Sequence, residues 1–220
     1  MDTGGFTWPI WLFRLLSWAA SLWRFITLRE ALFFRHSSLH TYKVLAKAKS
    51  RIVLHAAFYP TYASTADYSS ALRAALAKPS FGKLEVFLLS LNPMATWIPE
   101  FVRILRWNYS VDDFRSELTA SRIFFQHLRD DYPDKVVLYE TQLLPCFPLV
   151  IIDNIIYVGH YAHSKEPAPN GYWLRIKADV DKLVQWVDYP TLPVKPTDRS
   201  VAAYRFVAEY VNARCNSSKI

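Results

Sequence analysis

Three short apolar runs separated by helical stretches constrain the fold of this chain more than any other feature. The runs are RIVLHAAF (51–58), KLEVFLLSL (83–91) and KVVLYE (135–140), and they are rich in Val, Leu and Ile. Helix-like sequence over 64–78 connects the first two runs, and helix-like sequence over 97–130 connects the second to the third. Strands that alternate with helices in this way predict a largely parallel sheet flanked by helices, because a parallel connection needs a long crossover.

Two further apolar runs predict a hairpin beside this parallel unit. LVII (149–152) and IIYVGH (155–160) are rich in β-branched residues and are separated by an Asp-Asn pair, which favours a tight turn. YWLRIK (172–177) predicts one more strand. Helices are expected at 110–130, with a capping-box-like start Ser-Val-Asp-Asp, and at 179–188 and 198–214. The expected fold class is therefore α/β, with a largely parallel or mixed sheet.

The first 37 residues differ from the rest and predict a separate Trp/Arg-rich amphipathic helix. On a helix over 8–28, the polar residues Arg14, Ser17, Ser21 and Arg24 fall within about 80° of arc. A signal peptide is disfavoured because MDTGG has no positive charge, and two arginines at depth oppose a transmembrane span. Two interpretations stay open: a helix lying on an anionic membrane surface, or a helix packed on a partner or second copy. The contact residues expected over 6–35 are Trp8, Trp11, Arg14, Trp18, Trp23 and Arg24.

Composition limits the possible fold state, cellular compartment and binding partners of the chain. The second unit, 38–220, is long enough for one α/β domain, and 52% apolar content excludes a disordered chain. Two cysteines fit a reducing compartment, so a cytoplasmic location is expected. Peripheral membrane association would come from the N-terminal segment. The net charge of +7 fits an acidic membrane or nucleic acid, but no dense Lys/Arg block supports nucleic acid strongly. No cofactor or metal motif is recognised. His36 and His40, at the junction of the two units, are expected to be solvated.

Candidate site residues follow the predicted strands, where open α/β sheets bind ligands. His160 and His163 could converge on one ligand, with Glu140 and Asp153 orienting an imidazole and His55 adding a third nitrogen. Two histidines three residues apart are a weak metal signal without further ligand spacing. The alternative is that both histidines bond loop backbone and that Asp153 only makes the turn. Further ligand-binding candidates are Tyr59, Asn92 and Tyr161.

The segment 144–164 resembles the signature region of the phospholipase D superfamily. That motif is His-x-Lys, four residues, Asp, and a Gly-Ser pair after the next strand; here Asp153 and Gly159 match, the glycine one residue early. Cys146 occupies the His position, Pro148 the Lys position, and His160 follows the glycine. The resemblance covers about residues 38–190. The resemblance implies that these segments are strands of a core sheet like that family's. Its phospho-histidine mechanism is expected to be absent, because Pro supplies neither a cation nor a donor.

Two functional hypotheses follow. The first is a non-catalytic binding or effector module, in signalling or defence, which docks on a membrane or partner through residues 6–35. The second is a phosphodiesterase or nuclease with a rearranged site of His160, His163 and Glu140. Nucleic-acid binding without catalysis rests on net charge alone. The resemblance also implies a homo-oligomer, since single-domain relatives commonly pair. Cys146 is expected to be a small apolar filler, because no sequence neighbour lowers its pKa.

Overall fold

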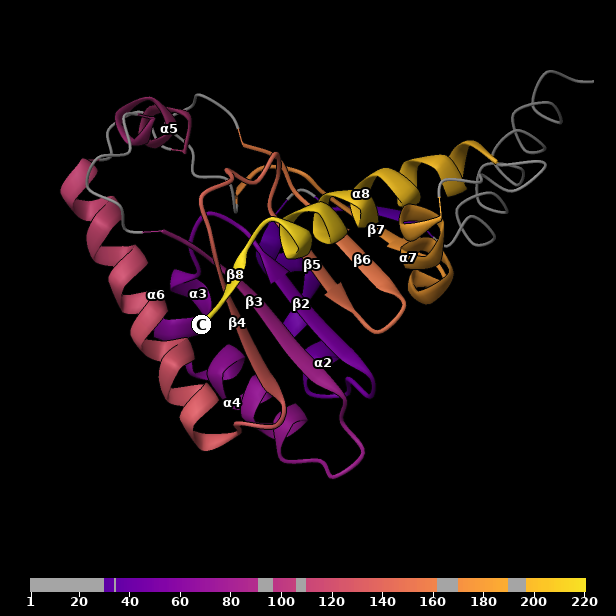
Figure 1. The fold of residues 1–220 in the computed structure, drawn as a ribbon, viewed down its shortest axis with the longest axis horizontal. Coiled ribbons are helices and arrows are strands. Elements are labelled where there is room, and N and C mark those ends of the chain that lie inside the picture. The colour runs from indigo at the N-terminus through magenta and orange to yellow at the C-terminus, as the bar shows by residue number, and fades with distance from the viewer. Residues whose placement is uncertain (1–29, 34, 91–96, 106–109, 162–169, 190–196) are drawn as a thin grey trace, which may run out of the picture.

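One eight-stranded sheet organises the part of the chain that the structure describes (Figure 1). The structure is a computed structural model, and it describes residues 30–33, 35–90, 97–105, 110–161, 170–189 and 197–220. The strand order is β1-β7-β6-β5-β2-β3-β4-β8. The strands are β1 (Glu30–Phe33), β2 (Arg51–His55), β3 (Lys83–Leu89), β4 (Val136–Thr141), β5 (Leu149–Ile152), β6 (Ile155–Val158), β7 (Trp173–Lys177) and β8 (Ser218–Lys219).

The sheet is mixed, with a parallel unit on one side and an antiparallel unit on the other. β2, β3 and β4 run parallel, as the three apolar runs predict. β5 lies antiparallel to β2 and forms the predicted hairpin with β6. β7, β1 and β8 also pair antiparallel with their neighbours, so the antiparallel part is larger than the hairpin alone implied. The predicted α/β class, with a mixed sheet flanked by helices, is confirmed.

Helices cover both faces of the sheet (Figure 1). The long helix before β4 is α6 (Val111–Asp131), and its predicted capping box is confirmed. The Ser110 hydroxyl accepts from the Asp113 N–H at 2.9 Å, and the Asp113 carboxylate accepts from the Ser110 N–H at 3.3 Å. The helical elements are η1 (His36–Leu39), α2 (Thr41–Leu45), α3 (Pro60–Ser64), α4 (Ala66–Leu76), α5 (Ile98–Leu105), α6 (Val111–Asp131), α7 (Val180–Asp188) and α8 (Asp198–Cys215).

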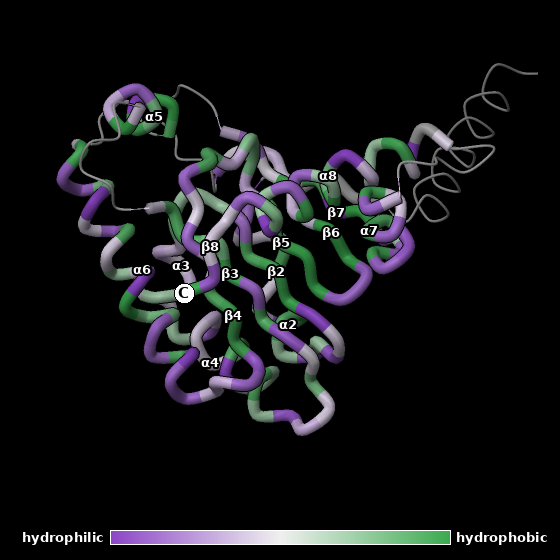
Figure 2. The backbone as a smooth tube through the Cα atoms, in the orientation of Figure 1, coloured by the Kyte–Doolittle hydropathy of each residue, from purple (hydrophilic) through white to green (hydrophobic). Residues whose placement is uncertain are grey.

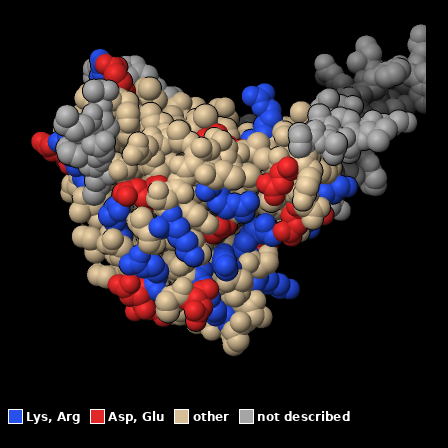
Figure 3. All heavy atoms as spheres, in the orientation of Figure 1, with Lys and Arg blue, Asp and Glu red and all other residues tan. Residues whose placement is uncertain are grey.

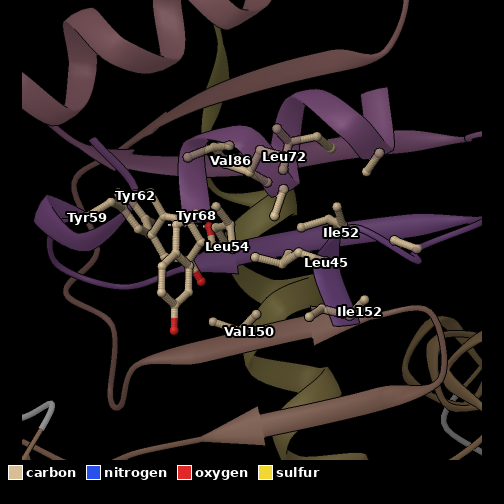
Figure 4. Close-up of a cluster of buried hydrophobic side chains, with 14 of the residues drawn as sticks. Leu45, Ile52, Leu54, Tyr59, Tyr62, Tyr68, Leu72, Val86, Val150 and Ile152 are labelled. Carbon is tan, nitrogen blue, oxygen red and sulfur yellow. Dashed lines mark hydrogen bonds between the residues drawn. The ribbon is translucent and has the colours of Figure 1, made fainter. Parts of the chain in front are cut away.

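The two-residue period of the strands divides the core between the two faces. On β2, Ile52 and Leu54 point to the layer of α2, α3, α4 and α6, whereas Val53 points to the layer of α7 and α8. Figure 2 shows that the central strands are mainly hydrophobic, which fits burial on both faces. Figure 4 shows the first layer, where Tyr59, Tyr62 and Tyr68 gather at one end of β2. That end of the sheet is where the chain leaves β2.

Strand β1 lies within the segment predicted to be separate from the domain. It pairs with β7 over four residues, so the sheet extends on the N-terminal side of the expected boundary at residue 38. The predicted helix over 8–28, with its tryptophans and arginines, falls outside the described residues. None of the helices in the described ranges has the length and apolar character needed to cross a membrane.

Candidate ligand cavity

A cavity of about 90 Å³, partly open to solvent, lies beyond the carboxyl end of β2. The chain forms it where β2 leaves the sheet into α3, next to the segment before β5, the residue after β6 and the start of β7. Six stretches of the sequence line it, at residues 36, 56–62, 105, 148–150, 161 and 173. Antiparallel pairing brings several of them together, because it places the starts of β5 and β7 beside the ends of β2 and β6. The lining side chains are mainly aromatic or aliphatic: His36, Ala56, Ala57, Phe58, Tyr59, Pro60, Thr61, Tyr62, Leu105, Pro148, Val150, Tyr161 and Trp173.

Tyr59, a predicted ligand-binding residue, lines this cavity, but its hydroxyl already has protein partners. The oxygen accepts from the Ala56 N–H at 2.9 Å and lies 2.6 Å from the Phe87 carbonyl and 2.9 Å from the Leu54 carbonyl. Burial raises the pKa of Tyr59 well above its usual range. The hydroxyl ties the turn after β2 to the sheet, so only the ring faces the cavity.

Tyr161 lines the same cavity from the end of β6. Its hydroxyl accepts from the Ala57 N–H at 3.0 Å, and its ring packs edge-on against Phe101, with centroids 5.6 Å apart. Burial raises its pKa, so the phenol stays neutral at physiological pH. Of the residues proposed from sequence, the structure brings Tyr59 and Tyr161 together at one site.

His160 lies next to Tyr161 and stacks on Tyr172, with ring centroids 4.2 Å apart. Its Nδ1 is buried and has no hydrogen-bond partner within the described part of the chain. It is not one of the residues that line the cavity. His163 and Asn92, the other candidates from these loops, fall outside the described residues.

His55 lies on the opposite face of the sheet from the cavity. Its side chain packs edge-on against Phe87, and neither ring nitrogen has a partner among the residues that the structure describes. Burial lowers its pKa to about 4, although the Glu209 carboxylate acts in the opposite direction. At neutral pH His55 is therefore an uncharged core residue.

Glu140 is at the same end of the sheet as His160 but in a distant strand. Three strands, β5, β2 and β3, separate their strands, which corresponds to roughly 19 Å at ordinary strand spacing. The Glu140 carboxylate instead accepts from Arg122 at 2.6 Å. The structure does not bring the predicted pair of Glu140 and His160 together.

Asp153 lies at the far end of the β5–β6 hairpin from His160. Its carboxylate accepts from the backbone N–H groups of Lys49, Ser50 and Arg51 at 2.7–3.2 Å and from the Ser50 hydroxyl at 2.9 Å. Burial alone would raise the pKa of Asp153, but these hydrogen bonds outweigh it and lower the pKa. Its φ of 50° makes the left-handed turn. Asp153 therefore ties the hairpin to the start of β2.

The two departures from the phospholipase D motif have different surroundings. Pro148 lines the cavity. Cys146 is exposed, contrary to the predicted apolar filler, and its N–H donates to Glu209 at 2.9 Å. Burial and the Glu209 carboxylate raise the pKa of the Cys146 thiol, which opposes nucleophilic use. Among the described residues, no group of three or more His, Cys, Asp or Glu side chains is placed to hold a metal ion.

Sequence analysis missed three of the residues that define the cavity: His36, Tyr62 and Trp173. The expectation that His36 is solvated is wrong, because it is only 8% exposed between Tyr68 and Trp173. Burial lowers the pKa of His36 to about 4. Trp173 at the start of a strand carried a usable signal, since a large residue on an alternating strand is expected to fill a core or a site. His36 and Tyr62 carried no such local signal.

Comparison with known proteins yields weak structural similarities only. No protein-family model matches the chain, and no curated protein matches it. Among solved structures, TrmBL2, described as an archaeal chromatin protein with a novel mode of DNA binding, has 15% identity and a TM-score of 0.42. NucT from Helicobacter pylori has 14% identity and a TM-score of 0.45. Phosphatidylserine synthase from Haemophilus influenzae Rd KW20 has 12% identity and a TM-score of 0.43.

The coverage of these neighbours is unequal. The alignments cover 95%, 87% and 87% of this chain, but 61% of TrmBL2, 98% of NucT and 46% of the synthase. The chain thus spans less than two thirds of TrmBL2 and of the synthase. NucT and the synthase both have phospholipase D-like folds. Similarities of this size assign no function to the chain.

Proposed function

We propose that this chain is a phospholipase D-like binding module without the phosphodiesterase chemistry of that family, associated with a membrane surface or a partner through residues 6–35. The observation that carries the proposal is that Pro148 forms part of the cavity wall. Where the family motif has a cationic lysine, this chain has an apolar ring in a cavity with aromatic walls. A phosphate group would lose its hydration there without gaining a cation.

The other motif positions support the same interpretation. Cys146 has a raised pKa and so is mainly the neutral thiol at physiological pH. The Asp153 carboxylate is occupied by four donors at the opposite end of the hairpin. Neither residue is arranged to attack a phosphorus atom or to hold a phosphate.

Docking through residues 6–35 rests on the Trp/Arg pattern of the sequence. Positive charge elsewhere is less concentrated: Figure 3 shows Lys and Arg interspersed with Asp and Glu over the visible face. A mixed surface of this kind gives a weaker attraction for a polyanion than a single basic block would. We therefore favour a membrane surface or protein partner over nucleic acid, and we expect a homo-oligomer.

Liposome co-sedimentation tests the docking step. Since β1 belongs to the sheet, removing residues 1–35 would also remove a strand. The sharper variant is the full chain with Arg14→Glu and Arg24→Glu, and the matched control is Arg103→Glu on α5. We expect the wild type and the control to bind anionic vesicles and the double variant to bind at least about tenfold less. Equal vesicle binding by all three proteins would contradict the proposal. A wild type that neither binds vesicles nor forms an oligomer would also contradict it.

A phosphodiesterase with a rearranged site is the second candidate, favoured by one observation. The His160 Nδ1 atom is buried without a partner among the described residues, as expected of a group kept for a ligand. The test is hydrolysis of a panel of phosphodiesters, including DNA and RNA, with several divalent metals. Activity that His160→Ala abolishes without lowering the melting temperature would replace the non-catalytic proposal. No hydrolysis by the wild type would remove the second candidate.

A further inference from the structure

The cavity beyond β2 carries no full charge at neutral pH on any described side chain that lines it. His36 is the one lining residue with a basic side chain, and burial lowers its pKa to about 4. The tyrosines Tyr59, Tyr62 and Tyr161 have raised pKa values because they are buried. An ionic ligand would therefore have no counter-charge in the wall, and its desolvation would oppose binding.

Two side chains in this wall have polar groups without partners. Tyr62 is 5% exposed and Trp173 is 4% exposed, yet neither the Tyr62 hydroxyl nor Trp173 Nε1 has a hydrogen-bond partner in the described part of the chain. The indole N–H can only donate, and the phenol can donate as well. Buried donors are nearly always satisfied in native proteins, so two unsatisfied donors on residues that line one cavity indicate a missing acceptor, which a small shift of these side chains would admit.

The position of Trp173 is set by the backbone beside it. A Cβ atom at Gly159 would lie 2.8 Å from the Trp173 ring and 2.9 Å from Pro148. The absence of a side chain at 159 thus lets the indole lie close to the backbone after β6, while His36 packs on it at 4.9 Å between ring centroids. The indole is held in place, which favours binding because little side-chain freedom remains to be lost.

We propose that this cavity binds a small neutral molecule that offers a hydrogen-bond acceptor, such as a carbonyl oxygen, to Trp173 Nε1 and the Tyr62 hydroxyl. The apolar part of the ligand packs against the aromatic walls formed by Phe58, Tyr59 and Tyr161. The cavity volume of about 90 Å³ is smaller than that of the engineered cavity of about 150 Å³ that holds benzene. The cavity is partly open, so the ligand is of single-ring size or a short branched chain that extends towards solvent. This inference goes beyond the proposed function and does not depend on residues 6–35.

Isothermal titration of the full chain with four probes of one shape tests the ligand chemistry. The probes are acetophenone, which is neutral and has an acceptor, ethylbenzene, which has no acceptor, benzoate, which is anionic, and phenyltrimethylammonium, which is cationic. We expect acetophenone to bind roughly tenfold more tightly than each of the others, the usual gain for one satisfied buried hydrogen bond. No binding of acetophenone, or tighter binding of either ion, would overturn the proposal.

Variants that remove one donor each test the two donors. Tyr62→Phe and Trp173→Phe should each weaken acetophenone binding by roughly five- to tenfold. Tyr62→Phe keeps the shape of the wall and should leave ethylbenzene within about twofold, whereas Trp173→Phe also makes the side chain smaller. Tyr157→Phe is the control, since Tyr157 is buried in the same core but does not line the cavity. The melting temperature of Tyr62→Phe should not fall, because its hydroxyl makes no bond with the described residues. Unchanged acetophenone affinity in both variants would overturn the proposal, whatever the liposome experiment shows.

Discussion

The two ends of the β2–β5 strand pair satisfy their polar groups in opposite ways. At the amino end of β2, the Asp153 carboxylate is charged and accepts from three backbone N–H groups and one hydroxyl. At the carboxyl end, the polar atoms of Tyr62, Trp173 and His160 are buried without partners in the described structure. A charged group whose hydrogen bonds are all formed stabilises the fold, whereas buried polar atoms without hydrogen-bond partners reduce its stability.

This difference indicates which end is available for binding. Proteins commonly retain locally unfavourable groups where a ligand completes them, because stability lost there is recovered on binding. Asp153, the acidic residue of the β5–β6 turn, belongs to the stabilising end. Residues with no obvious chemistry, an indole and a phenol, belong to the other end. The predictions below test this division, from the largest expected effect to the smallest.

Asp153→Ala should lower the free energy of unfolding by about 3 kcal/mol. The change leaves the N–H groups of Lys49, Ser50 and Arg51 without their acceptor, and water replaces it in part because the site is not fully buried. Asp153→Asn is the matched control, since Asn keeps one acceptor oxygen and tolerates the φ of 50°. It should cost about 1 kcal/mol. Urea unfolding measures both, and equal losses for the two variants would show that the charged carboxylate matters, and not the single acceptor oxygen or the turn geometry that Asn keeps.

Acidification should destabilise the protein through its buried histidines. The pKa of His55 is about 4 in the folded chain and 6.5 when unfolded, so the unfolded state takes up its proton first as the pH falls. Stability is therefore lost from about pH 6.5 down to about pH 4. His55→Leu should remove about 2 kcal/mol of the change between pH 7 and pH 5.

The same variant should be slightly more stable than the wild type at pH 7, because two unpartnered buried nitrogens are removed. Chemical unfolding of both proteins at pH 7 and pH 5 makes the comparison. His127→Leu is the control, because His127 is exposed on helix α6. A pH dependence that survives His55→Leu unchanged would show that this imidazole is protonated, or partnered, in the folded chain.

Gly159→Ala should destabilise the protein by about 1–2 kcal/mol, because the new methyl group meets the Trp173 ring and Pro148 at under 3 Å. The displaced indole should also weaken acetophenone binding. Gly171→Ala, in the loop before β7, serves as the control for a glycine that does not touch the cavity wall. Thermal unfolding and titration report the two effects separately. An unchanged melting temperature with unchanged binding would mean that Trp173 does not depend on Gly159.

Glu140→Gln should have the smallest effect, below about 1 kcal/mol, because its ion pair with Arg122 is partly exposed. Its distance from His160 also predicts that any hydrolytic activity would be unaffected. Melting temperature and the phosphodiester panel check both points. A large loss of stability would assign Glu140 to the fold, and a selective loss of hydrolysis would restore it as a catalytic residue.

Much of the fold could be predicted from sequence because it depends on local residue patterns. The runs 51–58, 83–91 and 135–140 are strands, the pair around Asp153 is a hairpin turn, and Ser110 begins a helix with a capping box. Each of these features depends on neighbours a few residues away. The antiparallel partners β1 and β8 were not predicted, since four- and two-residue strands carry too little pattern.

The candidate site was predicted less well, because residue type indicates chemistry but not partners. Glu140, Asp153 and His55 were grouped because each lies near a strand end. The strand order places Glu140 far from His160, the hairpin places Asp153 at its other end, and the pleat turns His55 to the opposite face. The sequence identifies the end of a strand but not the order of the strands.

By itself, the sequence determined the α/β class, since that class follows from residue patterns along single segments of the chain. Only the tertiary structure decided that Asp153 bonds residues more than a hundred positions away and that His36, Tyr62 and Trp173 surround one cavity. The physical reason is that hydrogen-bond satisfaction depends on which segments meet. That is set by the packing of the whole chain, and no local pattern records it.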